Sequence, residues 1–180
     1  MALSSLCLGA HPADAQEPSA AGLWQNIDPE TNKPDGWFYI YERNGTYEGA
    51  IVKMFLKPGD PPNPVCAKCE GEQQNAPWLG ITLIKGMERK GLEYANGTIL
   101  DPRYGTEWKA LMTLSADGQD LTVRGFLAIP AFGKDQYWKR LPDCSFATLD
   151  PVLSTRLKVA LPIPKPGAPL PKGTKPPAGC

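Results

Sequence analysis

Turn-forming residues recur at short intervals through the middle of the chain, and this recurrence restricts the fold more than any other feature of the sequence. The turn signals are Asn44-Gly45, Lys90-Gly91, Asp101-Pro102 with Gly105, and Asp117-Gly118. Asn-Gly and Asp-Gly pairs supply the positive φ values that two-residue β-hairpins require. Runs rich in β-branched and aromatic residues flank the turns, at 37–42, 46–53, 92–100, 106–114 and 120–127. The pattern predicts short antiparallel strands joined by tight turns.

Two of these runs alternate in the way that strands with one buried face do. The residues that share a face are Trp108, Ala110, Met112 and Leu114 in one run, and Leu121, Val123, Gly125 and Leu127 in the other. The first run also fits a helix, because Trp108, Leu111 and Met112 match a helical spacing. We favour a strand there, because a hairpin partner lies across Asp117-Gly118.

Three further runs, at 22–26, near 81–89 and at 136–141, bring the total to about eight strands at close spacing. Such a series is typical of an up-and-down barrel or a sandwich. Closing the sheet into a barrel would also remove its exposed edges. The fold class is therefore all-β, and an eight-stranded antiparallel barrel is the architecture we expect.

Two ends of the predicted sheet carry residues that favour the barrel. Gly22 and Trp24 open the first strand as a GxW triplet, and Trp138 and Arg140 share one face of the last strand. A guanidinium stacked on an indole is a cation–π contact, and an Arg from the last strand over a Trp from the first closes lipocalin-like barrels. The triplet alone is equally typical of an ordinary buried Trp near a strand start.

The cysteines fall in a loop rather than at the start of a helix. Cys66 and Cys69 lie in the Pro- and Gly-rich stretch GDPPNPVCAKCEG, which argues against the low thiolate pKa of a thioredoxin-like CxxC. We favour a local disulfide, which would pin the loop. A zinc site would have to recruit Cys144 and Cys180, so we expect no metal. Cys144 and Cys180 could instead pair and tether the tail, or Cys180 could join two chains.

Several of these motifs together resemble one family. The stretch from Gly22 to Leu141 is similar to the bacterial secreted family known as domain of unknown function 2147, through GLW, NPVCAKCEG, the segment from Pro77 to Gly80, GTILDPRYG, VRGF and the closing WKR. The resemblance implies a lipocalin-like β-barrel, export, binding of a small apolar ligand and no established reaction. The chain departs from the pattern at Lys134-Asp135, where an Arg-Thr pair is expected.

The N-terminal residues have the features of an export signal. Residues 2–10 are apolar or small, and Ala13-Asp14-Ala15 gives the AxA pattern that signal peptidase cleaves, here before Gln16. The usual positive n-region is missing, because the first basic residue is Lys33. We predict a signal peptide with a truncated start at 1–15, and a periplasmic or secreted protein. The alternative is a disordered cytosolic N-terminus.

The rest of the chain divides into a linker at 16–21, the barrel domain at 22–142 and a Pro-rich basic tail at 143–180. Proline occurs at every second or third position over much of 161–180, which excludes a helix or a central strand and favours extended or disordered backbone. The tail is either solvated, or a stiff cationic spacer that contacts an anionic envelope surface or a protein partner.

Charge argues against nucleic acid as a partner. The chain has 19 Lys and Arg and 19 Asp and Glu, for a net charge of zero. The basic residues after Pro151 face no acidic residue, so the body of the protein is acidic. Binding to nucleic acid depends on neutralising many phosphates, and this distribution does not favour it.

Enzyme chemistry is limited by the single histidine, His11, which lies in the predicted signal peptide. Without it there is no Ser-His-Asp triad or HExxH zinc site. Carboxylate chemistry remains, with Asp101, Glu107, Glu88 and Glu93 as candidates, or an acid paired with Arg124. For Asp101, Pro102 and Gly105 we favour a turn in which the Asp side chain caps backbone N–H groups. For Arg124 a surface ion pair is the simpler interpretation.

The sequence therefore favours a non-enzymatic binding protein without a cofactor. We expect a small apolar or amphipathic ligand in the barrel mouth, with Trp37, Tyr39, Trp78, Tyr94 and Arg124 as candidate contacts. An eight-stranded barrel can equally be filled by its own side chains. The second hypothesis is an envelope protein that acts through its surface and cationic tail, and the third is a carboxylate hydrolase.

Overall fold

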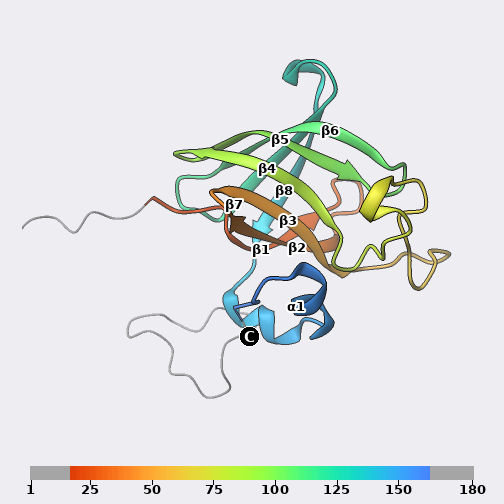
Figure 1. Ribbon diagram of the computed structural model, residues 1–180. Helices are drawn as coiled ribbons and strands as arrows, with labels where there is room; N and C mark the ends of the chain where they lie inside the picture. Colours follow the sequence, from red (N-terminus) through yellow and green to blue (C-terminus); the bar gives the residue numbers. More distant parts are fainter. Residues whose placement is uncertain (1–16, 163–180) are drawn as a thin grey trace, which may run out of the picture.

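Eight strands form a closed antiparallel barrel in the computed structural model, which describes residues 17–162 (Figure 1). Each strand pairs with its neighbours in sequence, and β8 returns to pair with β1. The strands are β1 (Gly22–Ile27), β2 (Pro34–Arg43), β3 (Thr46–Met54), β4 (Thr82–Lys90), β5 (Glu93–Asp101), β6 (Thr106–Leu114), β7 (Asp120–Phe126) and β8 (Lys134–Arg140). The all-β prediction and the eight-stranded barrel are confirmed, and the ambiguous run 106–114 is a strand.

One detail of the predicted alternation is wrong. Leu121 and Val123 are buried in the core, but Leu127 is 62% exposed and does not continue their face. The reason is that β7 ends at Phe126. The chain then leaves the barrel wall and makes a 3-10 turn, η2 (Pro130–Phe132), before β8 begins.

The inside of the barrel is filled by its own side chains. Trp24, Trp138 and Tyr94 are among the largest fully buried residues, and all three belong to the interior cluster. Phe38 stacks on Trp138, with 4.3 Å between ring centroids. Aliphatic and Met side chains fill the remaining space, among them Ile40, Ile84, Met87, Met112, Leu114 and Leu121. The sequence left two alternatives, a barrel with room for a ligand and a barrel filled by its own side chains. The structure has the second.

Residues 17–21, which the sequence analysis placed in a linker, pack against one end of the barrel. Ala20 is completely buried and its backbone N–H donates to the Tyr94 hydroxyl at 2.8 Å. Its carbonyl oxygen accepts a hydrogen bond from Trp24 Nε1, also at 2.8 Å. Arg89 donates through Nη2 to the carbonyl oxygen of Pro18 at 2.8 Å. The segment therefore closes the end of the barrel where β1 begins.

Arg140 joins the last strand to the first strand and to this segment. Its Cζ lies 4.3 Å from the centroid of the Trp24 indole, and the two residues are register partners in the β1–β8 pairing. Its guanidinium donates to the carbonyl oxygens of Ser19, Ala21 and Gly118. A Cβ at Gly22 would collide with this guanidinium, and Gly22 has φ +139°, which explains the glycine before the tryptophan.

The C-terminal segment covers part of the outer wall. The 3-10 helix η3 (Asp143–Thr148) and helix α1 (Val152–Leu157) follow β8 directly, and Figure 1 shows α1 beside the barrel. The outer cluster consists of Leu23, Tyr39, Tyr41, Ala50 and Val52 from the wall and Phe146, Leu149, Leu153, Leu157 and Leu161 from the segment. Residues 143–162 of the predicted tail are thus folded onto the barrel, and 163–180 lie outside the described residues.

No helix in the described part of the chain has the length and apolarity needed to cross a bilayer. The longest helical elements of the described residues are η3 and α1, with six residues each.

We predict that Arg140→Gln lowers the free energy of unfolding by about 3 kcal/mol, because three carbonyl groups lose a charged donor and the indole loses its cation–π partner. Urea unfolding measures the change. Lys139→Gln is the matched control, since Lys139 forms only an exposed ion pair with Asp120 and should change stability by less than about 0.5 kcal/mol. Equal effects of the two substitutions would show that Arg140 does not hold the barrel closed.

Candidate functional site

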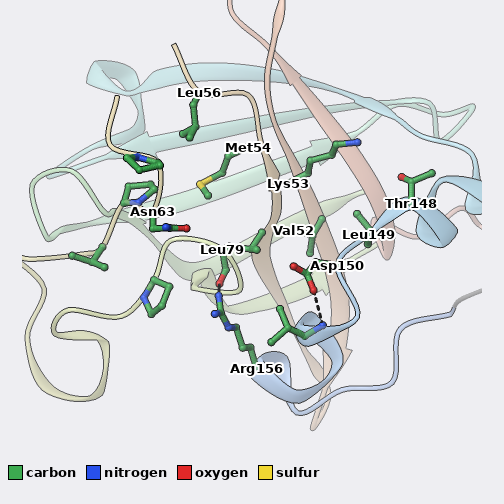
Figure 2. Close-up of a pocket in the computed structure, with 15 residues that line it drawn as sticks. Val52, Lys53, Met54, Leu56, Asn63, Leu79, Thr148, Leu149, Asp150 and Arg156 are labelled. Carbon is green, nitrogen blue, oxygen red and sulfur yellow. Dashed lines mark hydrogen bonds between the residues drawn. The ribbon is translucent and has the colours of Figure 1, made fainter. Parts of the chain in front are cut away.

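A cleft of about 580 Å³ lies outside the barrel, between the end of β3, the loop that follows it and the C-terminal segment (Figure 2). Its lining residues are Val52, Lys53, Met54, Leu56, Pro62, Asn63, Pro64, Val65, Pro77, Leu79, Thr148, Leu149, Asp150, Val152 and Arg156. Most of these are apolar, and the three prolines hold the loop backbone at fixed φ. The cleft is therefore a largely apolar site with walls from three parts of the chain.

Two cationic side chains lie at the edges of this cleft. Lys53 Nζ is 4.1 Å from the centroid of the Trp37 ring, and Arg156 Nη1 donates to the carbonyl oxygen of Leu79 at 2.7 Å. Neither forms an ion pair within 4.0 Å among residues 17–162. Asp150, the acidic residue of the cleft, accepts from the backbone N–H of Val152 at 2.9 Å. The site thus combines apolar walls with two cations that, in the described part of the chain, form no ion pair.

A smaller hollow of about 240 Å³ adjoins the cleft and shares four lining residues with it, Leu56, Asn63, Pro64 and Val65. Trp78 lines this hollow. Its indole nitrogen Nε1 is buried and has no hydrogen-bond partner in the described part of the protein. A buried donor without an acceptor costs free energy, so an acceptor that reached it would be favoured.

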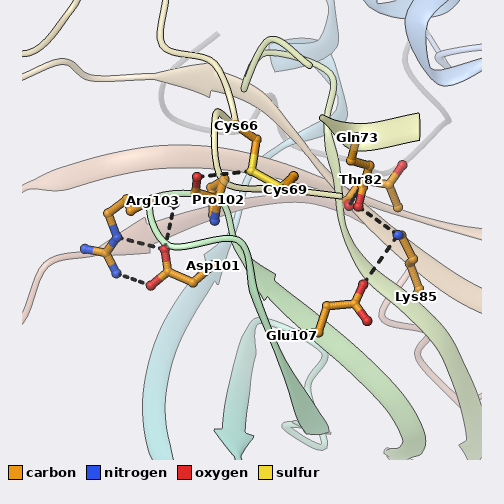
Figure 3. The surroundings of a disulfide bond; sticks show 9 residues. All are labelled: Cys66, Cys69, Gln73, Thr82, Lys85, Asp101, Pro102, Arg103 and Glu107. Atoms are coloured by element: carbon orange, nitrogen blue, oxygen red, sulfur yellow. Dashed lines mark hydrogen bonds and ion pairs between the residues drawn. A yellow bond between two sulfur atoms is a disulfide. The ribbon is translucent and has the colours of Figure 1, made fainter. Parts of the chain in front are cut away.

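The loop from 55 to 81 also carries the cysteine pair (Figure 3). Cys66 and Cys69 form a disulfide, which confirms the predicted local bridge, and both are buried in the interior cluster. Cys66 Sγ lies 3.2 Å from the carbonyl oxygen of Pro102. A disulfide sulfur has no hydrogen to donate, so this is a packing contact. Cys144 is disulfide-bonded as well, and the pairing of Cys180 lies outside the described residues.

Asp101, Pro102 and Gly105 form the turn between β5 and β6, against this disulfide. Asp101 accepts from the Arg103 backbone N–H at 3.0 Å and from the Arg103 guanidinium at 2.9 and 2.7 Å. Partial burial acts to raise the pKa of Asp101, but the hydrogen bonds from Arg103 outweigh it and lower that pKa. Gly105 has φ +68°, and a Cβ there would collide with the backbone of Lys68 and Cys69. The turn therefore packs directly against the backbone of the loop, which restricts the position of the loop.

Hydrogen bonds of Gln73 and Lys85 hold the other side of the same loop. Gln73, in η1 (Gly71–Gln73), donates through Nε2 to the carbonyl oxygen of Thr82 at 2.8 Å. Lys85 Nζ donates to Gln73 Oε1 at 2.9 Å and lies 3.6 Å from Glu107 Oε1. The loop is thus held to β4 directly, and to β6 only through Lys85, as well as to the β5–β6 turn.

The carboxylates that the sequence offered for hydrolysis are mostly engaged. Asp101 binds Arg103, Glu107 pairs with Lys85, and Glu88 accepts from Asn96 Nδ2 at 2.7 Å. Within residues 17–162 no group of three or more Cys, His, Asp or Glu is arranged to hold a metal ion. The side chains of Asp101, Glu107 and Glu88 thus make local structural contacts.

The four candidate aromatics do not meet at one barrel mouth. Tyr94 lies inside the barrel, and Trp78 lies in the loop over one end. Trp37 and Tyr39 belong to the outer cluster: the Trp37 indole donates to Gln25 Oε1 at 2.9 Å, and the Tyr39 ring packs edge-on against Phe146. Of the four, Trp78 lines the hollow beside the cleft, and Trp37 contacts Lys53, a residue of the cleft lining.

Arg124 lies on the outer wall and pairs with Asp135. Arg124 Nε and Nη2 donate to the two carboxylate oxygens at 2.6 and 2.7 Å, and these bonds lower the pKa of Asp135. Asp135 is one of the two positions at which the chain departs from the expected Arg-Thr pair. The departure supplies the carboxylate that binds Arg124.

Sequence reasoning missed the cleft because it treated everything after 142 as a tail. The pattern that predicts a packed segment was present: Phe146, Leu149, Leu153, Leu157 and Leu161 recur every three or four residues, as expected for one apolar face. The prolines of 161–180 favour extended backbone in that stretch alone and not in 143–160.

Comparison with known proteins agrees with the barrel. A family model described as "Uncharacterized protein conserved in bacteria (DUF2147)" matches residues 22–140. The curated proteins give no match. A solved structure, protein HP1028 from the human pathogen Helicobacter pylori, described as belonging to the lipocalin family, is similar with a TM-score of 0.64 and 16% identity, over 78% of this chain and 97% of that one. At this identity the likeness shows a lipocalin-like fold.

We predict that Gly105→Ala destabilises the protein by at least about 2 kcal/mol more than Gly45→Ala does. Both glycines have positive φ, but an added Cβ at Gly45 meets nothing within 4 Å, so that substitution should cost only about 1 kcal/mol. At Gly105 the Cβ collides with backbone as well. Urea unfolding of both variants tests the close packing of the turn against the loop, and equal losses of stability would contradict it.

Proposed function

We propose that this chain, which belongs to the DUF2147 family of uncharacterised bacterial proteins, is a non-enzymatic protein that binds a small amphipathic ligand in its outer cleft. The observation that carries the proposal is the division of space in the molecule. The lumen, where a lipocalin-like fold would hold a ligand, is filled by Trp24, Trp138 and Tyr94. The apolar cleft outside the barrel is open.

The chemistry of the cleft favours a ligand with an apolar body and an anionic head. A volume of about 580 Å³ is ordinary for a small-molecule site. Val52, Met54 and Val152 offer apolar contacts, and the two cations Lys53 and Arg156 outnumber the one carboxylate of the lining, that of Asp150. Arg binds carboxylates and phosphates in bidentate fashion, through two parallel N–H···O hydrogen bonds. We therefore infer a ligand of the fatty-acid type.

Export to the bacterial envelope is part of the proposal. The disulfide between Cys66 and Cys69 is typical of oxidising compartments. Cleavage before Gln16, as the AxA pattern predicts, would also leave residues 17–21 intact, and these are the residues that close the barrel. The predicted cleavage site is therefore compatible with the packing of residues 17–21 against the barrel.

We predict that a medium-chain fatty acid binds and that Val152→Trp weakens this binding at least tenfold, because the added ring occupies the cleft. Val152 is 37% exposed, so the fold should tolerate the change. Displacement of a fluorescent fatty acid, followed by calorimetry, measures the affinity. Unchanged affinity in Val152→Trp would place the ligand elsewhere.

The head group is tested with a matched pair of ligands, a fatty acid and the alcohol of the same chain length. Lys53→Gln and Arg156→Gln should each lower affinity for the acid about threefold to tenfold and leave the alcohol nearly unchanged, because each partly exposed cation is lost. Lys109→Gln removes a lysine that does not line the cleft and should alter neither. Loss of both ligands in the Lys53 variant would contradict a head-group role.

A further inference from the structure

The connection between β7 and β8 presents a continuous apolar surface to solvent. All six residues of 127–132 are apolar and exposed, with Phe132 84%, Leu127 62% and Ile129 49% exposed. We call these six residues the hairpin tip. Figure 1 shows this connection projecting away from the barrel wall. Exposed apolar residues in a continuous group mark interaction sites more often than single ones do.

The hairpin tip is held in a defined conformation. Gly133 donates its N–H to the carbonyl oxygen of Pro130 at 2.9 Å, and Phe132 donates to that of Ile129 at 3.2 Å. Arg124 Nη1 reaches the same Pro130 oxygen at 3.2 Å while the guanidinium binds Asp135. The apolar side chains are therefore displayed by a braced turn, which lowers the entropy lost on binding.

Two lysines flank the base of the hairpin tip. Lys109 is the register partner of Phe126, and Lys134 is the partner of Gly125. Both are exposed, and within residues 17–162 neither lies within 4.0 Å of a carboxylate. No charged residue occurs from 125 to 133. The hairpin tip is thus apolar and has a lysine without an ion pair in the described residues on each side of its base. This arrangement matches a surface in which an anionic layer covers an apolar interior.

The two ends of the barrel differ in the same sense. The loops at the end of the hairpin tip also expose Phe55, Leu56, Val65 and Tyr104. At the opposite end the turns are polar, with Asn44-Gly45, Lys90-Gly91 and Asp117-Gly118 at their centres, and none of the large exposed apolar residues of the described chain lies in them. The large exposed apolar loop residues are therefore gathered at the end that carries the hairpin tip.

We propose that the hairpin tip docks the protein on the surface of a lipid bilayer, with Phe132, Ile129 and Leu127 among the acyl chains near the headgroups and Lys109 and Lys134 against anionic headgroups. The size and shape of the tip favour this partner. A stable protein interface takes about 20 to 30 residues from each side, whereas a projecting tip of six residues can enter a deformable surface. The inference is independent of the ligand in the outer cleft.

The test is flotation of the full chain with phosphatidylcholine vesicles that contain or lack 30% phosphatidylglycerol, a composition of about one anionic lipid in three chosen so that each lysine meets negative charge. Wild-type protein should float with the anionic vesicles. Phe132→Ser with Ile129→Ser should lower the bound fraction at least fivefold. Val152→Ser removes an exposed apolar residue of the outer cleft and should have no effect.

The lysines are tested by Lys109→Gln with Lys134→Gln, which should remove the preference for anionic vesicles at low salt. Val152→Trp, the cleft variant, should bind vesicles like the wild type, so failure of this proposal and failure of the cleft proposal give different results. Urea unfolding establishes that each variant is folded.

Three results would overturn the proposal. One is absence of wild-type binding to either vesicle. Another is equal binding by the Phe132→Ser, Ile129→Ser variant, which would place membrane contact in another part of the chain. The third is a concentration-dependent dimer in sedimentation, lost in that variant while vesicles remain unbound, which would assign the hairpin tip to a second copy of this protein.

Discussion

The contact between Arg140 and the first strand is the constraint on which the rest of the structure depends. A sheet of eight strands exposes two edges unless its first and last strands meet, and here they meet through the β1–β8 pairing and the guanidinium over Trp24. The same guanidinium fixes the segment that closes one end, through Ser19 and Ala21. Burial lowers the pKa of Arg140, yet three carbonyl acceptors keep its charge satisfied.

A barrel closed in this way and filled by aromatic side chains has little room left for cargo. The fold keeps the lipocalin-like architecture, and the cleft lies outside the wall, where η3 and α1 pack on the outer face. The C-terminal segment has two roles as a result. It covers Tyr39 and Val52, which would otherwise be exposed, and it forms one side of the cleft through Leu149, Val152 and Arg156.

Much of the wall could be predicted from sequence, because each tight turn and each alternating run is a local signal. The face of a strand is harder to assign where both faces are apolar. In β2, the run WFYIY places Phe38 and Ile40 inside and Trp37 and Tyr39 outside, and nothing local distinguishes the two sets, since the outer face is covered by a segment more than 100 positions away. The cleft depends on the same long-range packing, so the sequence of β3 alone does not indicate it.

The meeting of the two ends of the sheet also has a kinetic consequence. Arg140 and Ser19 are separated by 121 positions, so the ring cannot be completed until the last strand has been made. Contacts of such long range slow folding, and until they form the first strand keeps an unpaired edge that can join a neighbouring chain. A newly made molecule should thus be most vulnerable to misassembly late, when seven strands are in place and the eighth is missing.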